Sequence, residues 1–238
     1  MHWGFLSTLH YLGLIGVSIA LSTKISTAVE TLIHQFFHPE YFSAITSPMK
    51  DSRDKAWNIF FRHSLPSYIS VTIFSSFMAP FLLQILAGKE FHEAWPFLIF
   101  GSFINLFRMI TNHMALIAHS EFKTSKLILP GFISAIFTVG LVSYSTTFNN
   151  YYYLIPLSLV CGSFIGLIAM FVRMNKIIKI SIHLRDVLIA CFFAILYMPS
   201  IFLYDRKLSI FISLGVVSLF GLYFIFTQLY FFRRFKIL

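Results

Sequence analysis

Two basic side chains, Lys24 and Arg108, lie well inside apolar stretches that are long enough to cross a lipid bilayer. A charge in hydrocarbon is costly, so such residues face a bundle interior or a water-filled cavity and mark a transport path. We therefore expect both residues to line such a cavity.

Each cation belongs to a polar face of its helix. The face around Lys24 covers an arc of roughly 120° and comprises Thr23, Lys24, Thr27, Glu30, Thr31, His34 and His38. The face around Arg108 follows i, i+3/i+4 and i+7 steps and comprises Gly101, Asn105, Arg108, Asn112, Ala115 and His119. The two faces predict one cavity wall, which includes Asn105 and Asn112.

Each assignment has a structural alternative. Lys24 could be neutralised by a partner on another helix, and Arg108 could extend towards the cytoplasmic surface some ten residues away, at roughly 15 Å. Asn105 and Asn112 could instead join helices through amide hydrogen bonds, the more common use of such residues.

Glu30 and His34 are spaced i and i+4, which suits a proton relay for ion-coupled transport, because carboxylate and imidazole chains serve that purpose in transporters. A local hydrogen-bonded pair near the inner interface is an equal alternative. His34 and His38 share a spacing used by metal sites, but a third ligand is missing, so we expect no metal and no cofactor.

The composition defines the elements that must position these residues. The chain has 238 residues, is 58% hydrophobic with 30 Phe, and is 11% charged, against roughly 25% in soluble domains. We predict an all-α, polytopic membrane helix bundle that forms a single unit over 1–238. Its seven spans are expected at 11–38, 64–87, 93–118, 125–147, 151–173, 187–204 and 208–231, with a polar connection over 39–62.

The distribution of basic residues orients these spans. When the loops are placed alternately on two sides, one side holds 13 of the 18 basic residues and the other holds Lys89, Arg206 and Lys207. This asymmetry predicts an N-terminus outside and a cytoplasmic C-terminus. The charge serves orientation and contact with membrane lipids, and nucleic acid is not an expected partner.

The block from Phe77 to Ser125 reads FMAPFLLQILAGKEFHEAWPFLIFGSFINLFRMITNHMALIAHSEFKTS. A Pro-containing apolar helix, a short Gly-Lys-Glu-Phe turn, Ala-Trp-Pro, and a polar helix that ends in Lys-Thr-Ser resemble the C-terminal half of Wzx-type oligosaccharide and polysaccharide flippases. These belong to the multidrug, oligosaccharidyl-lipid and polysaccharide exporter superfamily. The segment FFHPEYFSAI, Phe36 to Ile45, is similar to the end of the helix that opens that half.

The resemblance implies transport of lipid-linked oligosaccharide, on an undecaprenyl diphosphate carrier, across the bacterial inner membrane by alternating access. It implies cationic residues in a central cavity that attract a diphosphate or sugar acids, a role that Lys24 and Arg108 match. Arg suits such anions through its rigid fork of donors, and Lys suits them as a point charge. For the same cargo, Asn105 and Asn112 would contact sugar hydroxyls. Such flippases contain two pseudo-symmetric bundles, and we find no internal duplication here. We therefore expect the chain to need an N-terminal lobe or a second copy.

Other function classes fit less well. A seven-helix receptor is disfavoured because the last span has no lysine for a retinal Schiff base and no Asp-Arg-Tyr follows the third span. A membrane glycosyl or acyl transferase would need positioned carboxylates, and no paired Asp or Glu spacing occurs, so we do not expect an enzyme. A multidrug or cation antiporter of the same superfamily would favour acidic cavity residues, whereas Lys24 and Arg108 outnumber Glu30.

Overall fold

The computed structural model describes residues 2–47, 49–148, 151–203 and 209–234. All regular elements within these ranges are helices. They are α1 (His2–Ile45), α2 (Lys50–Leu86), η1 (Lys89–Ala94), α3 (Trp95–Ser120), η2 (Thr124–Leu127), α4 (Ile128–Ser145), α5 (Tyr151–Met174), α6 (Leu184–Ala194), η3 (Ile195–Tyr197), α7 (Pro199–Leu203) and α8 (Ile210–Arg234).

Among the described residues, seven helical stretches are long and apolar enough to cross a membrane, so the chain is a multi-pass membrane protein of the expected all-α class. They are His10–Ile45, Lys50–Leu86, Phe91–Ser120, Thr124–Ser145, Tyr151–Met174, Leu184–Leu203 and Ile210–Arg233. The sixth stretch is not one regular helix, because α6 gives way to η3 before α7 begins at Pro199.

The first connection was the main error in the predicted boundaries. We expected a polar connection over 39–62, but α1 continues to Ile45 and α2 begins at Lys50. The start of α2 is amphipathic, since Trp57, Phe60 and Phe61 are each at most 2% exposed despite their charged neighbours. Hydropathy locates only the apolar part of a helix that could cross a membrane. The buried aromatic residues at the start of α2 stabilise helix beyond that part.

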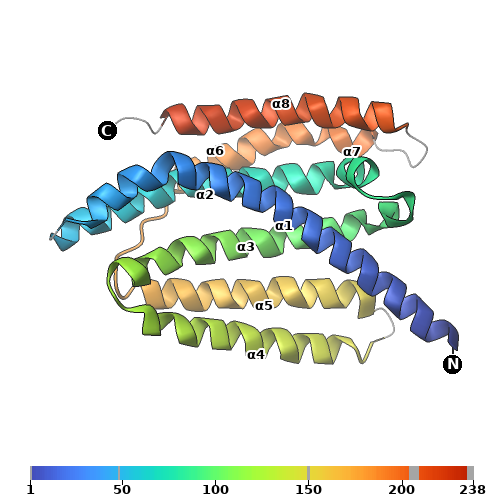
Figure 1. The fold of residues 1–238 in the computed structure, drawn as a ribbon, viewed down its shortest axis with the longest axis horizontal. Coiled ribbons are helices and arrows are strands. Elements are labelled where there is room, and N and C mark those ends of the chain that lie inside the picture. Colours follow the sequence, from blue (N-terminus) through green and yellow to red (C-terminus); the bar gives the residue numbers. More distant parts are fainter. Residues whose placement is uncertain (1, 48, 149–150, 204–208, 235–238) are drawn as a thin grey trace.

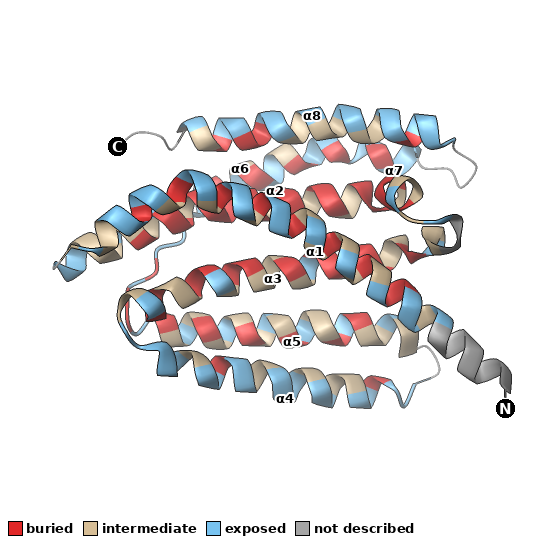
Figure 2. Cartoon of the chain, viewed as in Figure 1, coloured by how far each residue is buried: buried red, intermediate tan, exposed pale blue. Residues whose placement is uncertain are grey.

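The helices pack in two groups on either side of a central α2 (Figure 1). On one side α3, α5 and α4 lie in succession, and on the other side α6 and α8 pack against α2. Helix α1 crosses α2 and α3 diagonally and contacts both. Burial is greatest along α2 and α3 and least on α4 and α8, which present apolar surfaces to their surroundings (Figure 2).

The charged connections gather at one end of this bundle. The C-terminal ends of α1, α3, α5 and α8 and the N-terminal ends of α2, α4 and α6 all lie there (Figure 1). Described basic residues of this end include Lys55, Lys123, Lys179 and Arg185. Of the three basic residues expected at the other end, Arg206 and Lys207 lie outside the described residues, as does the side chain of Lys89.

Helices α4 and α5 approach closely because small residues face each other. A Cβ atom added at Gly166 would lie 2.7 Å from Ser134 Cβ, and Ser134 Oγ donates a hydrogen bond to Gly162 O at 3.1 Å. Thr138 occupies the space beside Gly162. Close backbone approach of this kind is how helices associate in lipid, where hydrophobic burial supplies no driving force between them.

We predict that Gly162→Val lowers the unfolding temperature of the protein in detergent. The added methyl groups would overlap Thr138 and force the helices apart, at a cost of about 1–3 kcal/mol. Gly140→Val is the matched control, because nothing lies within 4 Å of a Cβ added there. Equal unfolding temperatures for the two variants would contradict the packing described for Gly162.

An ion pair joins the charged ends of α2 and α3. Arg53 Nε donates to Glu121 Oε1 at 2.8 Å, and Nη2 donates to Oε2 at 3.3 Å. The hydrogen bonds from Arg53 lower the pKa of the Glu121 carboxyl group below its ordinary value. The pair contributes stability above the unfolded-state pKa of glutamate, and this contribution is lost as pH falls through the lowered folded-state pKa.

We therefore predict that Glu121→Gln lowers the unfolding temperature at pH 7 and that the difference from the unsubstituted protein shrinks as the pH is lowered below about 4. Thermal unfolding in detergent as a function of pH measures this. A difference that stays constant from pH 7 to pH 3 would show that the carboxylate charge is not what stabilises this end.

Candidate functional site

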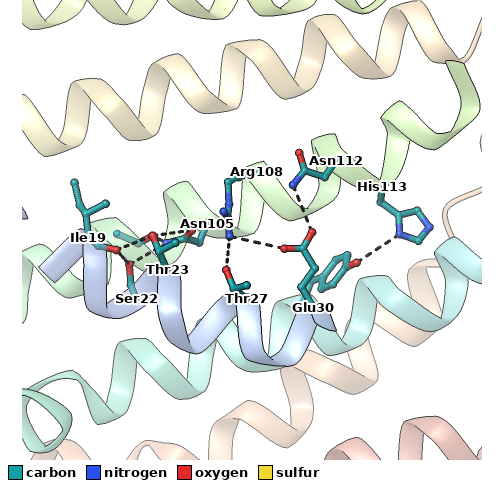
Figure 3. A network of polar contacts seen from close by, with 11 residues as sticks. Ile19, Ser22, Thr23, Thr27, Glu30, Asn105, Arg108, Asn112 and His113 are labelled. Carbon is teal, nitrogen blue, oxygen red and sulfur yellow. Dashed lines mark hydrogen bonds and ion pairs between the residues drawn. The ribbon is translucent and has the colours of Figure 1, made fainter. Parts of the chain in front are cut away.

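The polar faces of α1 and α3 meet along a line of contacts between the two helices (Figure 3). At one end of this line Asn105, which is 2% exposed, donates from Nδ2 to Ser22 Oγ at 2.9 Å and to Gly101 O at 2.8 Å. Thr23 Oγ1 lies 3.2 Å from Asn105 Oδ1. The absence of a side chain at Gly101 permits this approach, since a Cβ there would lie 3.2 Å from Ile19 Cα.

The charged part of the contact begins one turn further along α3. Arg108 Nη2 donates to Thr27 Oγ1 at 3.3 Å and lies 3.8 Å from Glu30 Oε2. Asn112 Nδ2 donates to the other carboxylate oxygen of Glu30 at 3.4 Å. The Glu30 side chain is 13% exposed and that of Arg108 is 39% exposed. These long contacts leave the guanidinium accessible while its charge is partly compensated.

Arg108 lies midway along α3. At about 1.5 Å per residue it is roughly 18 Å from either end of this helix, which is about as long as a bilayer is thick. Its guanidinium group turns sideways to α1 rather than along α3 towards the basic end of the bundle (Figure 3). Arg108 Nε is buried without a hydrogen-bond partner among the described residues. The alternative of an arginine that extends to the membrane surface does not describe this side chain.

A cavity of about 370 Å³ adjoins this contact between α3, α4 and α5. Arg108 and Asn112 line it from α3, and Ser134 and Ser163 line it from α4 and α5. Its volume lies within the range of about 300–1,000 Å³ that is usual for ligand pockets. Two of the four predicted substrate-binding residues therefore line a cavity.

The other two predicted residues are placed differently. Asn105 is buried in the contact between α1 and α3, where its amide hydrogen-bonds to Ser22. This is the arrangement expected of an amide that joins two helices. Lys24 is exposed on α1 and forms no ion pair with Glu30 or with any other acidic side chain in the described part of the chain. It shares this open side of α1 with Ala20, Ala28 and Thr31, which are also exposed.

The predicted coupling residues Glu30 and His34 do not form a hydrogen bond in the described structure. Glu30 contacts Arg108 and Asn112, whereas the His34 ring packs 4.6 Å from that of His38 and 5.9 Å from that of Phe60. His34 Nε2 and His38 Nε2 are both buried without a hydrogen-bond partner in the described part of the chain. Within those ranges, no three His, Cys, Asp or Glu side chains are grouped to hold a metal ion.

Sequence reasoning missed a buried histidine beside this network. His113 is 1% exposed, and its Nδ1 lies 3.5 Å from Tyr68 Oη of α2. Its ring packs against Phe60 and Phe61, and Trp57 Nε1 donates to its carbonyl oxygen. His113 follows Asn112 directly but points about 100° away from the face that we traced, towards α2. A search for polar residues on the buried side of the same helix would have found it.

The arrangement places an accessible guanidinium beside a carboxylate and the Asn112 amide near the middle of α3, which suits binding of a polar or anionic group. Comparisons with known proteins do not assign it to a family, because no family model, no curated protein and no solved structure matches the chain.

We predict that Arg108→Met destabilises the protein, because the Glu30 carboxylate, which is only 13% exposed, then loses its cationic partner. Adding Glu30→Gln to this variant should restore part of the lost stability, and the coupling energy between the two substitutions should be about 1 kcal/mol. Unfolding of the two single variants and the double variant in detergent measures this coupling. Strictly additive effects would show that the pair contributes nothing at 3.8 Å.

Proposed function

We propose that the chain forms one lobe of a transporter that flips lipid-linked oligosaccharide or polysaccharide units across the bacterial inner membrane. The N-terminus would lie outside and the basic end of the bundle in the cytoplasm. The cargo would be carried on undecaprenyl diphosphate. This is the function that the sequence resemblance implies, and the arrangement of charges within the apolar length of the bundle supports it.

The observation that carries the proposal is the pair of accessible cations at this depth. Arg108 is 39% exposed beside a cavity, and Lys24 is exposed on the open side of α1. Glu30, the acidic residue of the same contact, already faces Arg108 and Asn112. The surplus of positive charge suits an anionic carrier such as a diphosphate. A cation antiporter would require the opposite balance.

The open side of α1 supports the requirement for a second bundle. An ammonium group at this depth is costly if it faces lipid, so Lys24 needs water or a polar partner. A further lobe or a second copy of the chain, placed opposite α1, would enclose a wet path between the two. In this arrangement Lys24 lines the path directly, while Arg108 is reached through the contact between α1 and α3.

Glu30 provides a means of coupling transport to protons. Protonation of its carboxylate would remove the partner charge from Arg108 and leave the guanidinium available to the cargo. His34 lies one turn further along α1, where it could pass a proton towards the basic end. In the proposed coupling, protonation therefore weakens the contact between Glu30 and Arg108, and no metal is needed.

We predict that Lys24→Glu and Arg108→Glu each abolish surface polysaccharide in a complementation assay, because a carboxylate would repel the diphosphate. Lys24→Arg should retain activity, since it keeps the charge. Lys126→Glu, an exposed lysine of η2, is the matched control for charge reversal away from the path and should also retain activity.

Protein levels in the membrane must be measured for every variant, so that loss of transport is separated from loss of folding. Normal surface polysaccharide with both reversed charges would overturn the proposal. Sugar transfer by the purified protein, with no transport in vesicles, would instead favour the membrane transferase.

A further inference from the structure

A second cavity lies at the end of the bundle opposite the basic connections. Its volume is about 430 Å³, within the range of roughly 300–1,000 Å³ that is typical of ligand pockets. Five elements converge there: α1, the C-terminal end of α2, η1, and the N-terminal ends of α3 and α5. The residues that matter for its chemistry are Tyr11, Gln84, His92, Glu93, Trp95 and Tyr153.

The aromatic residues of this cavity are held in place by stacking. The Tyr153 ring stacks on the Phe97 ring, with centroids 5.5 Å apart and planes at 30°. Tyr153 is nevertheless 49% exposed. Tyr11 stacks on Tyr152 with centroids 4.3 Å apart. Trp95 begins α3, where Pro96 restricts the backbone of the first turn. Fixed rings lose little conformational entropy when a ligand contacts them.

Polar groups accompany these rings. Glu93 is exposed, and His92 is half-buried beside it on η1. Gln84 comes from α2, and its Oε1 accepts a hydrogen bond from Ser213 of α8, which fixes the orientation of the amide. The cavity therefore combines aromatic surface with a carboxylate, an imidazole and an amide.

This combination matches the two-sided surface of a sugar ring. A pyranose presents C–H groups that pack on aromatic faces, and its hydroxyl groups hydrogen-bond to carboxylates and amides around the edge. A lipid chain would displace water from Glu93 and His92 without replacing its hydrogen bonds, and an anion would be repelled by Glu93. We propose that this cavity binds a neutral or amino sugar and discriminates against uronic acids through the Glu93 carboxylate.

The inference goes beyond the proposed function, because it concerns a separate cavity and requires no transport. Arg108 and Lys24 are proposed to attract the anionic carrier, whereas this cavity would hold part of the glycan. Sugar binding can therefore be present when transport fails, and transport can be present when this cavity binds nothing. The two proposals are tested by different readouts.

Sugar binding is measured by saturation-transfer difference NMR on the full chain in lipid nanodiscs. Nanodiscs avoid maltoside detergents, which themselves contain sugars. The probes are methyl glucoside, methyl N-acetylglucosaminide and methyl glucuronide. We expect the first two to bind, and the glucuronide to bind about tenfold more weakly, as a charge facing Glu93 predicts. Tyr153→Ala and Glu93→Ala should each weaken glucoside binding by about tenfold.

Glu93→Gln gives the sharpest outcome, because it keeps hydrogen bonding and removes the charge, so the preference for glucoside over glucuronide should disappear. Tyr144→Ala and Glu40→Gln are the matched controls, since both residues lie outside this cavity and both variants should bind like the unsubstituted chain. The proposal is overturned if no sugar binds, if Tyr153→Ala and Glu93→Ala bind as well as the controls, or if tetramethylammonium occupies the cavity in preference to glucoside.

Discussion

The contact between α1 and α3 is the constraint on which the rest of the structure depends. Arg108 lies midway along a helix that crosses the bilayer, where an isolated guanidinium is unfavourable. Glu30 and Thr27 of α1 supply its partners, so these helices must lie side by side in one register. Asn105 and Gly101 repeat the requirement one turn away, through a buried amide and a close backbone approach. The diagonal course of α1 follows from these contacts.

This contact also divides the polar residues of α1 into two sets. Ser22, Thr23, Thr27 and Glu30 contact α3, whereas Lys24 and Thr31 remain on the open side. The division gives the proposed transport path two components: a supported guanidinium beside a cavity and an accessible ammonium on an adjacent face. A binding surface of this kind belongs on rigid, well-packed helices, and the low exposure of α2 and α3 provides that support.

Much of the fold could be predicted from the sequence, because hydropathy and span length are dominated by the bilayer. The seven spans followed from hydropathy and length, and the polar faces of the first and third helices followed from periodicity. The extension of α1 and α2 beyond the membrane did not, since it depends on Trp57 and Phe60 finding buried partners. Likewise, periodicity placed Asn105 on the correct face but could not show that α1 would cover it and leave Lys24 open. Which polar residues pair is a property of helix register, and register is set by tertiary contacts such as Gly101 against Ile19.

The central claim is that the open side of α1 around Lys24 faces water rather than lipid. The most direct measurement is the reactivity of single cysteines in native membranes towards a charged, water-soluble thiol reagent, after Cys161 and Cys191 are replaced by serine. Ala20→Cys and Thr31→Cys flank Lys24 on its face, and Val139→Cys on α4, 65% exposed, represents a surface in contact with lipid. We predict that the two α1 cysteines react rapidly and that the α4 cysteine does not. Reactivity at Ala20→Cys and Thr31→Cys as low as at Val139→Cys would contradict the account.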